Sequence, residues 1–284
     1  MQKRWWLVLA VNMGCTEPLP STSTVDVLRI LALTTPTPEV RPGIAIGVRA
    51  VWFDPIGGRR IQWRWRLCNE DLANDPRSCA RGIGSTELAS GEVDHVEVPA
   101  AMLALSGTER SRTWMVYALA CPSSGALIAP AEGRLECSDG SGSESFRRVT
   151  VHAQAPLNEP PAIGAWTVEH AGRLSSLEDG TTVGVGSLVG CAGDCASLTL
   201  TLTPAAGASE RFGETAESLL GSVYVSSGSV SPPRVVMDPG TEVPMVMHWT
   251  PGRVILGGEV AQVWAVLRDQ RGGESVRSVT ITAR

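Results

Sequence analysis

The stretch that decides the fold is IQWRWRLC, residues 61–68. Its apolar side chains occupy every second position, and polar side chains fill the positions between: Ile61, Trp63, Trp65 and Leu67 against Gln62, Arg64 and Arg66. In an extended chain, successive side chains point to opposite faces, so this alternation predicts a strand with one buried and one wet face. No long segment of the chain shows the apolar periodicity of an amphipathic helix.

Similar short segments recur along both halves of the chain, separated by turn residues. Gly (30) and Pro (19) are frequent, as expected where many strands are joined by turns. The predicted strands are 27–33, 44–53, 61–68, 93–98, 114–121, 146–153, 165–169, 182–189, 197–203, 221–226, 234–237, 243–249, 259–267 and 275–282. Residues 114–121 are apolar on both faces and are expected to be central. This spacing predicts an all-β protein of two tandem immunoglobulin-like β-sandwich domains.

The predicted organisation has five parts. They are a signal peptide (1–14), a lipidated cysteine with a flexible tether (15–24), β-sandwich domain 1 (25–154), a Pro-rich linker (155–161) and β-sandwich domain 2 (162–284). The linker contains Pro156, Pro160 and Pro161, and consecutive prolines favour a semi-rigid spacer.

The N-terminus indicates export. Lys3 and Arg4 precede an apolar run of residues 5–11, which is far shorter than the about 20 residues that span a bilayer but suits a signal-peptide core. With Gly14-Cys15 directly after it, the segment resembles a bacterial lipoprotein precursor, although Asn12 and Met13 depart from the usual residues before the cysteine. The resemblance implies lipidation of Cys15 and an outer-membrane lipoprotein on the periplasmic or surface face. The alternative is an ordinary leader with an incidental cysteine.

The cysteine count is consistent with export. The chain has seven, and setting Cys15 aside leaves six that fall into sequential pairs: Cys68–Cys79, Cys121–Cys137 and Cys191–Cys195. Each pair closes a short loop, as disulfides do in oxidising compartments. Other pairings of the six are formally possible. Zinc is the other use of such residues, but no C-x2-C pair is present, so no metal is predicted.

Several short motifs occur in a fixed order: PEVRPG (38–43), WRWRLC (63–68), a Pro-Pro linker, WTP (249–251) and VWAVLRDQRGG (263–273). The last resembles the terminal hairpin of PKD-type and related immunoglobulin-like domains. Their order is similar to that in surface lipoproteins of myxobacteria and their relatives. The resemblance implies a surface location and the sandwich fold, and it implies no activity.

Motifs of catalysis are not found. The four histidines, His95, His152, His170 and His248, show no metal-ligand spacing, and nucleophile-elbow, P-loop and dinucleotide motifs do not occur. We therefore predict a protein that is not an enzyme and has no cofactor. The net charge of −5 is spread along the chain and does not suggest nucleic-acid binding.

Two segments have alternative interpretations. Asp139–Glu144 offers two carboxylates to calcium, but it also fits a polar hairpin tip, which we prefer. Arg59, Arg60, Arg64 and Arg66 form either a site for an anionic polymer or a solvated face paired with acidic residues, and we prefer the latter.

Three functional hypotheses follow. The first is a cell-envelope-anchored structural or interaction lipoprotein, attached to the membrane by its lipid, with an unknown protein or polysaccharide partner. The second is a glycan-binding accessory protein, which requires an exposed aromatic platform. The third is a hydrolase with a dispersed site, which requires His152 or His248 beside a carboxylate and a serine.

Overall fold

The computed structural model describes residues 23–69, 76–123, 127–128, 135–154, 156–185, 197–212, 214–251 and 260–283. Almost all regular structure in these ranges is β-strand, which confirms the all-β prediction. The helices are α1 (Pro76–Ala80) and the 3-10 helix η1 (Ala100–Leu103).

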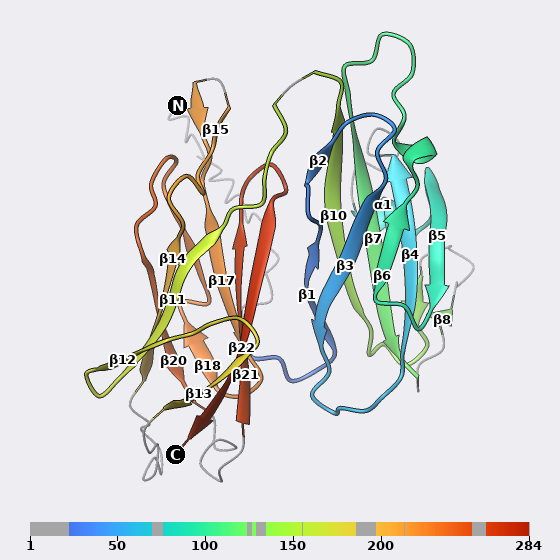
Figure 1. The fold of residues 1–284 in the computed structure, drawn as a ribbon. Coiled ribbons are helices and arrows are strands. Elements are labelled where there is room, and N and C mark those ends of the chain that lie inside the picture. Colours follow the sequence, from blue (N-terminus) through green and yellow to red (C-terminus); the bar gives the residue numbers. More distant parts are fainter. Residues whose placement is uncertain are drawn as a thin grey trace, which may run out of the picture.

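The first pair of sheets lies on the right in Figure 1. A three-stranded sheet has the order β1-β3-β6 and a five-stranded sheet the order β2-β10-β7-β4-β5. The strands are β1 (Arg29–Thr34), β2 (Glu39–Val40), β3 (Ile46–Phe53), β4 (Ile61–Asn69), β5 (Ser85–Gly91), β6 (His95–Val98), β7 (Ser111–Pro122) and β10 (Ser143–His152), with a small sheet of β8 (Leu127–Ile128) and β9 (Glu136–Cys137).

Alternation along β4 produces the core of this pair. Ile61, Trp63, Trp65 and Leu67 are buried, and the residues between them are half-buried. The rings of Trp63 and Trp65 stack with their centroids 5.7 Å apart. Indole Nε1 of Trp65 donates to the carbonyl of Val93 at 2.9 Å, so burial of this ring leaves no polar atom unpaired. Strand β7 lies between β10 and β4, as its apolar character on both faces predicted.

The second pair consists of two five-stranded sheets, β12-β11-β14-β20-β18 and β13-β22-β21-β17-β19. The strands are β11 (Ile163–His170), β12 (Arg173–Ser176), β13 (Thr181–Val185), β14 (Leu198–Pro204), β17 (Leu220–Val225), β18 (Ser229–Ser231), β19 (Arg234–Val236), β20 (Met245–Thr250), β21 (Val260–Arg268) and β22 (Glu274–Ala283), with a small hairpin of β15 (Arg211–Phe212) and β16 (Thr215–Ala216). Both sheets contribute to one core that includes Trp166 and Trp249.

Each pair of sheets thus encloses its own apolar core. The sandwich architecture is confirmed, whereas the number of independently folding domains stays a prediction. Strands β21 and β22 form the terminal hairpin expected from the sequence, in register from Val260↔Thr282 to Arg268↔Glu274. Figure 1 shows the tip of this hairpin directed toward β2 of the first pair.

Two disulfides join Cys68 to Cys79 and Cys121 to Cys137, the first two pairs expected from the sequence. Together with Ala80, Met115 and Leu135, they form a small apolar cluster on the outer side of β7. The loops that they close therefore cover a sheet face that would otherwise be wet. Cys15, Cys191 and Cys195 lie outside the described residues.

Two boundaries differ from the sequence prediction. Ser23 and Thr24 were placed in a flexible tether, but Ser23 is buried and its hydroxyl accepts a hydrogen bond from the amide of Val230 at 2.7 Å. Asn158 was placed in a spacer, but it is only 1% exposed. Ser23 packs against the second pair of sheets, whereas Asn158 has polar partners on both pairs, Glu39 and Asp269. Strands β5 and β12 were not predicted, since they lack an apolar alternation.

Candidate functional site

The two pairs of sheets meet at an apolar junction. Its buried members are Val25, Leu31, Ala32, Tyr224, Trp264 and Val266, with Val51, Phe53 and Val276 packed against them. The rings of Phe53 and Trp264 lie 4.8 Å apart, centroid to centroid, at a tilt of 56°. Strand β1 can serve two cores because its pairing with β3 is irregular between Ile30 and Ala32, and Leu31 and Ala32 face the junction. The junction is therefore a third apolar layer between the sandwiches.

Polar contacts surround this layer, beginning with the β21–β22 turn. The carboxylate of Asp269 accepts hydrogen bonds from the amides of Arg271 (2.8 Å) and Gly273 (2.6 Å). Gly273 has no room for a side chain, since a Cβ there would lie 1.9 Å from Oδ2 of Asp269 and 2.8 Å from Cδ of Pro161. The Asp-x-x-Gly-Gly sequence thus forms a tight tip that packs against the linker.

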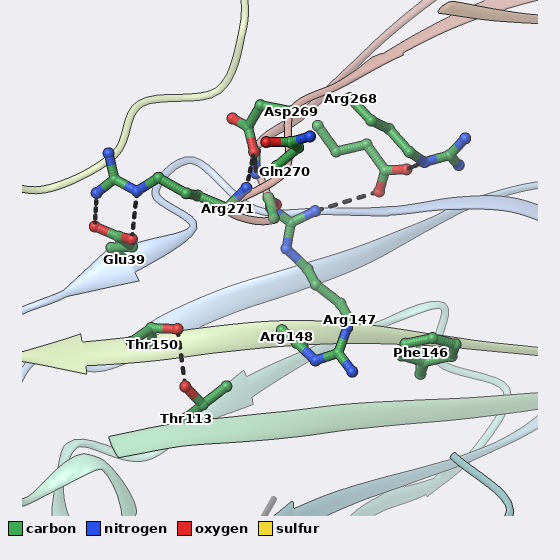
Figure 2. Close-up of a pocket in the computed structure, with 13 residues that line it drawn as sticks. Glu39, Thr113, Phe146, Arg147, Arg148, Thr150, Arg268, Asp269, Gln270 and Arg271 are labelled. Carbon is green, nitrogen blue, oxygen red and sulfur yellow. Dashed lines mark hydrogen bonds and ion pairs between the residues drawn. The ribbon is translucent and has the colours of Figure 1, made fainter. Parts of the chain in front are cut away.

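The tip presents Arg271 to the first pair of sheets. Its guanidinium donates twice to the buried carboxylate of Glu39 on β2, with Nε 3.0 Å from Oε1. Figure 2 shows the two groups facing one another. The other oxygen of Glu39 also accepts a hydrogen bond from the backbone N–H of Asn158 at 2.9 Å. The side-chain amide of Asn158 donates to the carboxylate of Asp269 at 3.0 Å. One carboxylate therefore joins β2, the linker and the hairpin.

A second ion-pair group lies on the other side of the turn. Glu274 on β22 contacts Arg147 of β10 (Nη1 to Oε2, 3.2 Å) and Arg268 of β21. The side chains of Arg147 and Glu274 are 3% and 9% exposed. These groups also bind the backbone of β1: Arg147 and Arg268 donate to the carbonyls of Leu33 and Leu31, and Glu274 accepts the amide of Leu33.

Burial and charge act in opposite directions on the two arginines. Removal from water lowers the pKa of Arg147, and the charge of Glu274 offsets only part of that effect. Burial acts downward on Arg268 as well, but Glu274 and Tyr224 outweigh it and raise the pKa. Nε of Arg147 is buried and has no hydrogen-bond partner, although the rest of its guanidinium does.

A cleft of about 410 Å³ opens between these groups, along β10 and the hairpin tip. Figure 2 shows its lining residues. Arg147, Arg148, Arg268 and Arg271 line it together with Glu39, Asp269 and Glu274, so opposite charges are interspersed. At its rim, Phe146 is 42% exposed, and the guanidinium of Arg148 lies 5.8 Å from its ring centroid. The cleft is thus bounded by residues of both pairs of sheets.

The four arginines predicted as a possible polyanion face have partners near them in the chain or sheet. Arg59 pairs with Asp54, Arg60 with Glu92 and Arg64 with Glu87, while Arg66 donates to the carbonyls of Cys79 and Ala80. The guanidinium of Arg59 is the main cause of the lowered pKa of Asp54. The charges of Arg59, Arg60 and Arg64 are thus compensated locally, and both interpretations of this face stay predictions.

The remaining predicted positions are dispersed. His95 lies on β6, His170 on β11 and His248 on β20, where Ser231 is its cross-strand partner. Nε2 of His152 lies 3.6 Å from Oε1 of Glu39, and Ser111 of β7 is opposite His152 in the strand register. In the 139–144 segment, Asp139 binds Ser141 and Glu144 accepts the hydroxyl of Tyr117, so the two carboxylates have separate uses. Every tryptophan between residues 23 and 283 that the structure describes is buried or half-buried, which leaves no exposed indole platform there.

No protein family and no curated protein matches the chain. Solved structures share a β-rich fold with it at low similarity. The trypsin-activated alpha-2-macroglobulin of Escherichia coli has 13% identity over 90% of this chain and 18% of its own, with a TM-score of 0.26. The human desmocollin-1 ectodomain has 9% identity over 89% and 42%, with a TM-score of 0.24.

Latent dimeric PorU from Porphyromonas gingivalis has 12% identity over 95% of this chain and 21% of its own, with a TM-score of 0.23. The chain spans less than half the length of each of these proteins, and such TM-scores carry no functional argument. The resemblance to myxobacterial surface lipoproteins stays a prediction.

The disulfides indicate a compartment outside the reducing cytoplasm, extracellular or periplasmic. Among the described residues, no helix combines the length and apolar character that crossing a membrane requires.

The junction residues were not predicted from the sequence as a site. One signal was present, because Arg147 shares its strand face with Val149 and Val151 and so occupies an inward position. An arginine at such a position indicates a buried ionic partner. The sequence pattern does not say where that partner is.

Proposed function

We propose that the protein is an exported, lipid-anchored structural or interaction protein of the cell envelope. In this role it presents the joined sandwiches to a protein or polysaccharide partner, and it catalyses no reaction. The observation that carries the proposal is the junction, in which an apolar layer and two groups of ion pairs hold the sandwiches against one another. A buried junction of this kind keeps the two sandwiches in a fixed relative position, which suits a protein that presents them at the end of a tether.

The attachment point of the predicted tether supports the same role. The amide of Val25 donates to the carbonyl of Val225, and the amide of Val225 donates to the carbonyl of Ser23, both at 2.8 Å. Residues 23–25 are thus fastened to the second pair of sheets before the chain enters β1. An anchor at Cys15 would hold the protein through this fastened segment, at a defined place on its surface.

Metabolic labelling with palmitate tests the anchor. We expect label in the full chain, loss of label in Cys15→Ser, and no change in Ser21→Ala, a control within the same predicted tether. Fractionation should move Cys15→Ser from the membrane to the soluble envelope fraction. Labelling that persists in Cys15→Ser would contradict the lipid anchor and leave an exported protein held in some other way.

A further inference from the structure

Glu217 is a buried acid that the fold leaves without a hydrogen-bond donor. It lies between β16 and β17 with its side chain 5% exposed. Neither carboxylate oxygen has a hydrogen-bond partner. Nε of the Arg271 guanidinium lies 3.6 Å from Oε1 of Glu217, but that nitrogen already donates a hydrogen bond to Glu39. Leaving an ionised carboxylate in this state is costly, because its lost hydration is not replaced.

The groups around Glu217 are mostly acidic. The hairpin tip contributes Asp269 and Arg271, the segment before β15 contributes Glu210, and β2 contributes Glu39. Oε2 of Glu210 lies 3.6 Å from Nη1 of Arg271. On β10, His152 adds a titratable ring 3.6 Å from Glu39. One guanidinium therefore serves three carboxylates, from both pairs of sheets.

This surplus of negative charge favours a neutral Glu217. Burial is the largest cause that raises its pKa, to about 7, and the nearby carboxylates add to the rise while Arg271 opposes it. A carboxyl group with such a pKa changes its charge within the range of environments that envelope proteins meet.

We propose that Glu217 is a proton-operated latch at the junction between the two sandwiches. When Glu217 carries its proton, the guanidinium of Arg271 is committed to Glu39 and the hairpin tip is held on β2. When the proton leaves to water, ionised Glu217 competes with Glu39 for Arg271, and the tip is held less firmly. The inference concerns regulation of the same junction that carries the proposed function.

The direction of the pH effect follows from linkage. Because the pKa in the folded protein lies above the ordinary value of 4.5, the native state binds this proton more tightly than the unfolded chain does. The contribution to stability is therefore complete below the ordinary value and is lost as the pH rises through about 7. Alkaline conditions weaken the junction and mildly acidic conditions strengthen it.

Carboxyl-detected NMR on the full chain, with Glu217→Gln to assign the signal, measures the titration directly. We expect a Glu217 carbon that titrates near 7, whereas a midpoint near 4.5 overturns the latch. This measurement requires only that the wild-type protein folds. Its failure would not touch the proposed anchor, which is tested by labelling at Cys15.

Amide hydrogen exchange tests the consequence. Relative to intrinsic rates, wild-type amides in 269–273 should lose protection between pH 6 and pH 8, by up to about tenfold for each unit above the midpoint. Glu217→Gln, which imitates the neutral acid, should abolish this change, and Glu214→Gln, an exposed glutamate in the same small hairpin, should preserve it. Protection that falls equally in wild type and Glu217→Gln would overturn the proposal.

Discussion

The carboxylate of Glu39 on β2 is bound by the guanidinium of Arg271 at the tip of the β21–β22 hairpin, across 232 positions of sequence. Glu39 belongs to the PEVRPG segment and Arg271 to the DQRGG segment, two of the motifs that carry the resemblance to surface lipoproteins. The pair brings these distant motifs into one contact.

Substitutions at this pair should reveal coupling between the sandwiches. We expect Glu39→Gln to lower the free energy of unfolding by about 1.5–3 kcal/mol, the range for hydrogen bonds to charged groups. A double-mutant cycle with Arg271→Met should give an interaction energy of about 0.5–3 kcal/mol in urea unfolding. Strict additivity of the two substitutions would show that the contact contributes nothing to stability.

The buried group around Glu274 should be more sensitive. Glu274→Ala leaves Arg147 and Arg268 without their carboxylate, and removing one partner of a buried pair costs about 3–5 kcal/mol. Glu92→Ala is the matched control, because Glu92 pairs with an arginine that is 78% exposed and should matter by less than about 1 kcal/mol. Equal losses in the two variants, measured by urea unfolding, would contradict the assignment of Glu274 as a buried counter-ion.

The hairpin tip offers a steric test. Gly273→Ala places a methyl group against Asp269 and Pro161, so the tip must move away from the linker, and we expect a loss of about 1–3 kcal/mol. Gly47→Ala in β3 meets nothing within 4 Å and should change the stability by less than about 0.5 kcal/mol. If thermal unfolding shows Gly273→Ala as stable as Gly47→Ala, the tip is not packed as described.

Strand positions could be predicted because their signal is local. The alternation of apolar and polar residues along 61–68 predicts one buried face, and in the structure that face of β4 contains the stacked rings of Trp63 and Trp65. The sequential disulfides at Cys68 and Cys121 could be predicted for the same reason, since each closes a short loop. Strand β5 was missed because its mostly polar residues at a sheet edge bury little and so show no period.

The candidate site could not be predicted because it depends on where one sheet lies against another. Residues 263–267 are apolar on both faces of the strand, which indicates that both faces are buried. The pattern does not say which part of the chain covers the second face. The covering strand is β1, whose own run of buried residues has the same ambiguity. Asn158 shows the converse: it stands between prolines of a predicted spacer, and only the position of Glu39 and Asp269 makes it a buried residue.

We expect Trp264 to couple the unfolding of the two sandwiches. Its ring packs on Phe53 and closes the apolar layer between them, so Trp264→Ala removes a contact that neither sandwich core supplies. We expect one cooperative transition in calorimetry for the wild type, and two separate transitions for Trp264→Ala, with a loss of about 3–5 kcal/mol. Phe146→Ala, on an exposed ring outside this layer, should keep the single transition. Two transitions already in the wild type would show that the junction does not couple the sandwiches. In that case, the predicted tether would carry two sandwiches that fold independently.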